Sequence, residues 1–316
     1  MFFSDLNNLR DISFSEEFAD ICGITEKELR YYFPEGIRQL AEREGVTYEE
    51  ACNELKLNYD GYRFSRSGSD IYNPWSVLNA MRESSVYDYW AETGKPTIVV
   101  EALRALNVDL EKILNTECTL DQLKGLDLSN IDPLPLLYQT GYLTIKDYDR
   151  ETKLFKLGVP NKEVTRSLFN ELLPYYISVG RDTPDSVARD IMNAILKGEP
   201  VRMMENINTF LAAIPYEMKM EDENNFHNAL YILLTLIGAR TETEVHTSDG
   251  RIDLVVKTTK FIYIIELKFG KSSRNAIDQI ENKRYDWPYL GDSRRIFRIG
   301  ANFNPATRRL DPPEIR

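Results

Sequence analysis

Two apolar runs with charged ends decide the fold of the last third of the chain: Arg251-Ile252-Asp253-Leu254-Val255-Val256 and Phe261-Ile262-Tyr263-Ile264-Ile265-Glu266-Leu267-Lys268. Both have the length of a strand and are rich in β-branched residues. Only Thr258-Thr259-Lys260 separates them, which is short enough for an antiparallel hairpin. The second run is apolar up to Glu266, so we expect a central strand that is buried on both faces.

The charged residues of this hairpin are expected to cluster at one end of the sheet. Side chains alternate between the two faces of a strand, so Glu266 and Lys268 share a face. If the turn centres near Thr259, Asp253 pairs across from residues 264–266. Glu-x-Lys alone is commonly a solvated ion pair at a strand end. Its combination with Asp253, a short turn and a buried strand is more specific.

Two neighbouring carboxylates repel each other and call for a cation, and hard oxygen ligands suit Mg²⁺ or Mn²⁺. We therefore predict a divalent metal held by Asp253 and Glu266. Such a metal lowers the pKa of a bound water and neutralises charge on a phosphodiester in the transition state. Lys268 would steady the attacking hydroxide or the phosphorane oxygens.

The flanking helices add three candidate residues. The apolar stripe of a helix over 222–237, extended back by three residues, reaches Glu223, which either joins the site or complements the helix dipole. A helix over 275–285 places Gln279 and Lys283 one turn apart. These two side chains either reach a phosphate backbone or form a solvated helix face.

The charge distribution separates two regions of the chain. The net charge is −11, but residues 221–316 carry +1 and residues 1–220 carry −12. Arg294 and Arg295 begin a further expected strand over 294–300, where they either line a nucleic-acid groove or are plain surface charge. The charge therefore argues only against a broad nucleic-acid-binding face on residues 1–220.

The upstream region is expected to be helical over about the first 125 residues and then to form a hairpin between helices. Strands over 142–145 and 154–159 lie between helices over 134–139 and 163–176, an order that is similar to a winged helix. Such modules contact DNA or pack against protein, and the local acidity favours packing. A helical stretch over 186–211 follows. We predict three domains, at residues 1–125, 126–215 and 216–316.

The composition indicates the expected cellular location and excludes some classes of active site. The chain has no apolar run of about 18 residues, so no membrane span is expected. It opens without the pattern of a secretory signal, and its three cysteines lie far apart, as in a reducing cytoplasm. With only two histidines, a zinc cluster or a Ser-His-Asp relay is not favoured.

Residues 216–316 resemble the PD-(D/E)xK nuclease domain, through Glu223, Gly250-Arg251-Ile252-Asp253, Ile265-Glu266-Leu267-Lys268 and Gln279-Ile280-Glu281-Asn282-Lys283-Arg284-Tyr285. The resemblance implies a restriction-endonuclease-like α/β domain with a central mixed sheet. It implies that Asp253 and Glu266 bind Mg²⁺ or Mn²⁺, that Lys268 is the catalytic lysine, and that Glu223 and Gln279 assist. It also implies nucleic acid as the partner, with DNA favoured over RNA.

The upstream region resembles the distal half of bacterial AAA-ATPase-like proteins that carry such a nuclease domain at their C-terminus. The similar motifs are Leu6-Asn7-Asn8-Leu9-Arg10-Asp11-Ile12-Ser13, Tyr59-Asp60-Gly61-Tyr62-Arg63-Phe64, Tyr72-Asn73-Pro74-Trp75-Ser76-Val77-Leu78 and Gln139-Thr140-Gly141-Tyr142-Leu143. The fold class is therefore mixed α and α/β, with a helical and winged-helix-like region before the nuclease-like domain.

The phosphate-binding loop of that ATPase family, G-x-x-x-x-G-K-[ST], is not found. Gly270-Lys271-Ser272 has Ile265 where the first glycine belongs, and Gly94-Lys95 is followed by Pro96. We expect no ATP hydrolysis by this chain. Two functions remain open: a metal-dependent nuclease, and a catalytically inactive nuclease fold that serves as a binding or regulatory module.

Overall fold

The computed structural model describes residues 11–92, 97–106, 108–125, 132–176, 183–212, 223–239, 244–248 and 251–316. The chain forms two compact units, Met1–Glu171 and Leu172–Arg316, and each is described by itself. The three domains expected from the sequence divide the chain differently, and their boundaries stay predictions.

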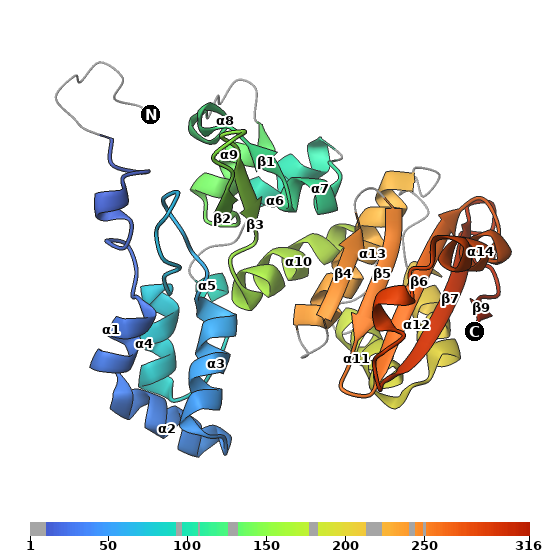
Figure 1. Cartoon of the computed structure of the whole chain (residues 1–316), viewed down its shortest axis with the longest axis horizontal. Helices are drawn as coiled ribbons and strands as arrows, with labels where there is room; N and C mark the ends of the chain where they lie inside the picture. Colours follow the sequence, from blue (N-terminus) through green and yellow to red (C-terminus); the bar gives the residue numbers. More distant parts are fainter. Residues whose placement is uncertain are drawn as a thin grey trace. The chain divides into compact units, whose positions relative to one another are not determined.

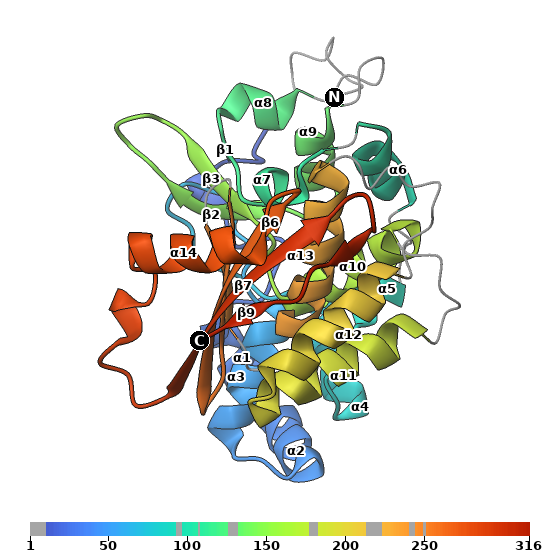
Figure 2. The same ribbon diagram turned by 90° about the vertical axis from the view of Figure 1, so that its right-hand side faces the viewer.

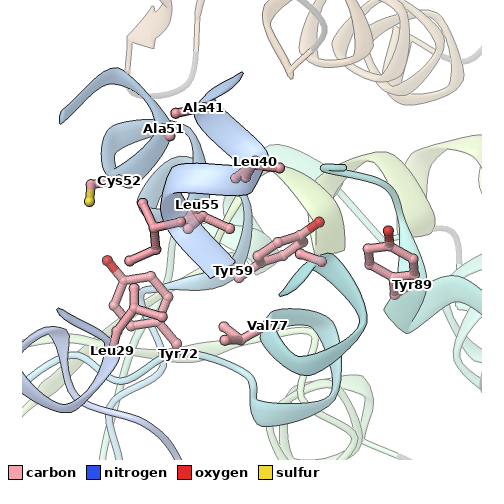
Figure 3. Close-up of a cluster of buried hydrophobic side chains, with 12 residues drawn as sticks. Leu29, Leu40, Ala41, Ala51, Cys52, Leu55, Tyr59, Tyr72, Val77 and Tyr89 are labelled. Carbon is pink, nitrogen blue, oxygen red and sulfur yellow. The ribbon is translucent and has the colours of Figure 1, made fainter. Parts of the chain in front are cut away.

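The first unit begins with a short 3-10 helix, Glu16–Phe18, and a group of helices (Figure 1): α1 (Glu26–Tyr32), α2 (Pro34–Glu44), α3 (Tyr48–Tyr59) and α4 (Pro74–Glu83). Capping boxes at Thr25 and Thr47 begin α1 and α3, and Asn73 caps α4 just before Pro74. Their apolar faces enclose a buried cluster that includes Leu55, Tyr59, Tyr72 and Val77 (Figure 3).

The rest of the first unit consists of short elements around a small sheet: α5 (Tyr89–Glu92), α6 (Thr97–Ala105), α7 (Leu110–Leu114), β1 (Glu117–Cys118), α8 (Leu120–Lys124), α9 (Pro133–Gln139), β2 (Thr144–Tyr148) and β3 (Phe155–Gly158). The long helix α10 (Lys162–Tyr176) follows. The strand order is β1-β3-β2, and both pairs are antiparallel. The region expected to be helical over about the first 125 residues also contains β1, a two-residue strand that leaves no periodic pattern.

The second unit contains helices α11 (Thr183–Lys197), α12 (Pro200–Ala212), α13 (Glu223–Ala239) and α14 (Ser273–Lys283), with a 3-10 helix at Trp287–Tyr289. Its strands are β4 (Glu244–Ser248), β5 (Arg251–Lys257), β6 (Phe261–Phe269), β7 (Arg295–Asn304), β8 (Arg309–Leu310) and β9 (Glu314–Ile315). The strand order is β4-β5-β6-β7-β8, with β9 also paired to β7. Because β5 is antiparallel and β7 is parallel to β6, the predicted mixed sheet is confirmed.

Helices cover both faces of this sheet (Figure 2). Helix α14 packs Ile277 and Ile280 against Ile262 and Ile264 of β6. On the other face, Phe226 of α13 stacks on Phe303 at a centroid distance of 4.4 Å. The even-numbered residues of β6 therefore face α14, and this is the face on which alternation places Glu266 and Lys268.

Two features of the second unit differ from the sequence-based expectations. The helical stretch over 186–211 is two helices, since the chain turns at Gly198, which has a φ of +75°. Strands β4, β8 and β9 were not expected. Within the described part of the chain, none of the helices has both the length and the apolar character that a membrane crossing requires.

Candidate active site

The β5–β6 hairpin brings two acidic positions opposite each other. Asp253 and Glu266 are Cα partners in the antiparallel ladder, as the sequence predicts. The turn between the strands is closed by the backbone N–H of Thr258, which donates to the carbonyl oxygen of Phe261 at 2.8 Å. Directly opposite residues lie on the same face of a sheet. The register therefore puts both acidic positions on the face that α14 covers.

Glu266 and Lys268 form a buried ion pair at the end of β6. The Nζ atom of Lys268 lies 2.5 Å from Oε1 of Glu266, and the two side chains are 15% and 1% exposed. Residues 262–267 are all buried, so the strand is central, as expected. Burial of a charge requires a charged or hydrogen-bonding partner, and Lys268 supplies one for the first oxygen of this carboxylate.

The second carboxylate oxygen of Glu266 has no such partner among the described residues. Oε2 is buried and accepts no hydrogen bond from any described residue. A buried carboxylate oxygen left unsatisfied costs free energy. A hard divalent cation satisfies such an oxygen, and carboxylates are the ligands that Mg²⁺ and Mn²⁺ prefer. Glu266 therefore fits the role of metal ligand that the sequence predicts.

Helix α14 lies unusually close to the sheet beside Glu266. Gly300 of β7 is the Cα partner of Glu266. A Cβ atom at Gly300 would lie 2.4 Å from the backbone nitrogen of Ile277 and 2.6 Å from the carbonyl oxygen of Ser273. Only glycine permits this approach. The Oγ atom of Ser273 is also buried and finds no hydrogen-bond partner among the described residues.

Asn302, which the sequence reasoning missed, organises the end of this site. It is the Cα partner of Lys268 on β7 and is 1% exposed. Its Oδ1 atom accepts a hydrogen bond from the backbone N–H of Lys271 at 2.7 Å. Ser272 then caps α14 by accepting from the backbone N–H of Asn275. Asn302 thereby fixes the segment that joins Lys268 to α14, and a lone polar residue within the apolar run of residues 299–303 was the signal.

Two predicted residues lie on α14. The Nε2 atom of Gln279 donates to the hydroxyl oxygen of Tyr285 at 3.2 Å, and the Gln279 side chain is half-buried. Lys283 is exposed, and its Nζ atom lies 5.8 Å from the centroid of the Tyr285 ring. Both residues thus lie on the helix that covers the Glu266 face, and both contact Tyr285, which follows that helix.

The predicted arginines lie at the other end of the sheet. Arg295 is the Cα partner of Phe261, five positions before the pairing of Gly300 with Glu266. This separation is about 16 Å along a strand. Arg294 pairs with Asp292 at 2.6 Å and donates to the carbonyl oxygen of Thr258 at 3.0 Å. The guanidinium of Arg295 lies over the Phe297 ring. The structure therefore does not bring them to the Glu266–Lys268 pair.

Glu223 is the first residue of α13, and Asp253 is the third residue of β5. Their side chains lie outside the described part of the structure, so the roles predicted for them stay predictions. Phe226, one turn after Glu223, contacts the rings of Phe269 and Phe303, so α13 begins near the end of the sheet at which β6 ends. Among the side chains that are described, no group of three His, Cys, Asp or Glu residues could hold a metal ion.

A mixed sheet between helical layers, with an acid and a lysine two residues apart on its central strand, is consistent with a PD-(D/E)XK nuclease domain. Comparison with known families agrees: residues 221–311 match the family described as the PD-(D/E)XK nuclease superfamily, and this segment is a domain of that superfamily. The chain is also 28% identical, over 321 residues, to an "Uncharacterized protein in vnfD 5'region" of Azotobacter chroococcum mcd 1. That match covers 97% of this chain and 58% of the relative. No solved structure matches the chain.

Proposed function

We propose that residues 221–311 form a metal-dependent nuclease that hydrolyses phosphodiester bonds in nucleic acid, with DNA favoured over RNA. The observation that carries the proposal is the buried Glu266 carboxylate, which has one oxygen paired to Lys268 and the other without a described partner. Membership of the segment in the PD-(D/E)XK superfamily supports it.

In this proposal, Glu266 and Asp253 hold Mg²⁺ or Mn²⁺. The metal would supply charge neutralisation at the phosphodiester and a bound water of lowered pKa. Lys268 is held beside Glu266 on a rigid central strand, so its ammonium group is preorganised to stabilise negative charge on the reacting phosphate. Gln279 and Glu223 are proposed as assisting residues, and Lys283 as a contact to the nucleic-acid backbone.

The test is cleavage of labelled DNA and RNA with and without Mn²⁺ or Mg²⁺, in the wild type and in Glu266→Gln and Asp253→Asn. Each variant should lose cleavage by at least about a hundredfold, in line with the loss of a metal ligand or its support. The matched control is Asp278→Asn on α14. Like the two test variants it removes one negative charge, but the charge that it removes belongs to the surface pair with Arg274. Equal cleavage by the wild type and Glu266→Gln would contradict the proposal.

A calorimetric titration with Mn²⁺ separates the nuclease from an inactive nuclease fold. The proposal requires Mn²⁺ binding that Glu266→Gln abolishes. Binding without any cleavage in the wild type would favour a regulatory or binding module. We also propose that residues 1–215 belong to an ATPase-derived module and that residues 126–215 contain a winged helix, both supported by sequence resemblance. A cytoplasmic location is proposed from the composition. Nucleotide hydrolysis by this chain would contradict the expectation that it has no ATPase activity.

A further inference from the structure

A cleft in the first unit carries an excess of positive charge. It lies between the loop at residues 65–68 and the β2–β3 hairpin and has a volume of about 580 Å³. Its cationic lining residues are Arg66, Arg150 and Lys153, and its acidic ones are Glu16 and Asp147. All three cations are exposed, and none has an ion pair with a described residue.

Both acids of the cleft are engaged by the protein itself. The carboxylate of Glu16 accepts hydrogen bonds from the hydroxyls of Ser65 at 2.8 Å and Ser67 at 2.6 Å. It also accepts from the backbone N–H groups of Arg66 and Ser67 at 3.1 and 3.3 Å. Asp147 accepts from the backbone N–H of Tyr148 at 2.8 Å. Glu16 thus fixes the loop that carries Arg66, and the three cations remain available to a ligand.

Arg66 is held in place by aromatic packing. Its guanidinium lies 4.8 Å from the centroid of the Tyr148 ring. Tyr148 in turn packs against Phe155, which is 1% exposed, at a centroid distance of 4.8 Å. A guanidinium fixed in this way presents its N–H donors with little loss of rotamer freedom, and its planar fork matches the oxygens of a phosphate.

Lys153 occupies a backbone conformation that favours glycine. Its φ is +60°, in the turn that the backbone N–H of Asp149 closes on the carbonyl oxygen of Leu154. A non-glycine residue in the left-handed region is strained, and such strain concentrates at functional positions. A lysine at this position places a third cation in the cleft at a cost to the hairpin.

We propose that this cleft binds the phosphate backbone of a nucleic-acid strand, with Arg66, Arg150 and Lys153 as the phosphate contacts. The proposal rests on the proposed nuclease function only for the choice of nucleic acid among phosphate esters. It agrees with the acidity of residues 1–220, because three cations in one cleft make a local site rather than a broad basic face.

Fluorescence anisotropy of the full chain in EDTA tests the site, with a labelled single-stranded oligonucleotide of about 12 nucleotides. The Arg66→Ala/Arg150→Ala/Lys153→Ala variant should bind at least about tenfold more weakly and lower the slope of log affinity against log salt by about 2. The matched control is Lys27→Ala/Arg82→Ala/Lys112→Ala, which removes three exposed cations elsewhere in the same unit and should bind like the wild type. Equal affinity and slope in the cleft variant would overturn the proposal.

Two further measurements exclude simpler explanations. Lys153→Gly relieves the backbone strain, so it should keep or raise the melting temperature while it weakens binding; unchanged binding would count against the site. Inorganic phosphate or a mononucleotide that competes as well as the oligonucleotide would overturn the choice of a nucleic-acid strand. If the oligonucleotide binds through the cleft but is not cleaved with metal, the proposed nuclease function is contradicted and the binding site is kept. If it is cleaved but binds equally well without the three cations, the binding site is contradicted and the nuclease function is kept.

Discussion

Asn302 and Asp311 bind each other beside β7: the Asn302 amide donates to Oδ2 of Asp311 at 2.6 Å, and the backbone N–H of Asp311 donates to the Asn302 carbonyl oxygen at 2.8 Å. Asn302 also holds the backbone of Lys271. One buried amide therefore connects the end of β6, the start of α14 and the segment after β8. This arrangement makes Asn302 a positioning residue for the Glu266–Lys268 pair.

An exchange of these two side chains tests that role. Asn302→Asp puts a carboxylate against Asp311, so we expect a loss of about 2 kcal/mol of unfolding free energy together with weaker cleavage. Asn302→Asp/Asp311→Asn restores one donor and one acceptor in reverse order and should recover most of both losses. Urea unfolding and cleavage rates are the measurements. A double variant no better than Asn302→Asp would contradict the proposed contact.

Lys268 is expected to affect stability and metal binding differently. Lys268→Met leaves the Glu266 carboxylate buried without its cation, which should cost about 3 kcal/mol without metal. Because the metal is expected at the carboxylate, Mn²⁺ should still raise the melting temperature of this variant, although cleavage is lost. Glu266→Gln should lose both the Mn²⁺-dependent shift and cleavage. The absence of an Mn²⁺ shift in the wild type would contradict this assignment.

Gly300 offers a test of the close approach of α14. Gly300→Ala forces a Cβ atom onto the backbone of Ile277, so α14 must move, at a cost of about 1–3 kcal/mol and with reduced cleavage. Gly291→Ala is the control, because a Cβ atom there meets nothing within 4 Å. Thermal unfolding of the two variants is the comparison. Equal melting temperatures would show that the helix does not pack as described.

Glu163 is expected to make the stability of the first unit depend on pH. Its carboxylate is fully buried and accepts hydrogen bonds from Ser76 Oγ and the backbone N–H of Trp90, both at 2.8 Å. Burial raises its pKa from 4.5 to about 7, and these hydrogen bonds only partly oppose the shift. The folded state therefore holds the proton more tightly than the unfolded state. The contribution of Glu163 to the free energy of unfolding is therefore complete below pH 4.5 and is lost as the pH rises through 7. The total change in this free energy is about 3 kcal/mol.

Glu163→Gln is the corresponding variant, since the amide stays neutral and can pair with both partners. Relative to the wild type, it should gain stability between pH 5 and 8, measured as the difference in melting temperature. Glu171→Gln removes the same charge from an exposed position of α10 and should show no such trend. A difference that does not change with pH would contradict the raised pKa of Glu163.

The sequence predicts the β5–β6 hairpin well because two long apolar runs flank a three-residue turn. The short strands β1, β4, β8 and β9 escaped prediction, since two to five residues of mixed composition carry no period. The position of Arg294 and Arg295 depends on the direction of β7. A parallel neighbour of β6 starts at the end remote from Glu266, and strand direction cannot be read from local composition. Asn302 stands out in the sequence as a lone polar residue in an apolar run, but its position opposite Lys268 follows from the strand register.

The three-residue turn between β5 and β6 also bears on the order of folding. The acidic positions 253 and 266 meet through a local hairpin, whose closure carries a small loop entropy. Gly300 and Asn302 reach β6 only after the chain has passed through α14 and returned in parallel, a slower, non-local step. We therefore expect the two acidic positions to pair early in folding, from adjacent sequence, and the groups that position Lys268 to join them later. Substitutions in α14 and β7 should therefore alter the precision of the site more than the pairing of its two acidic positions.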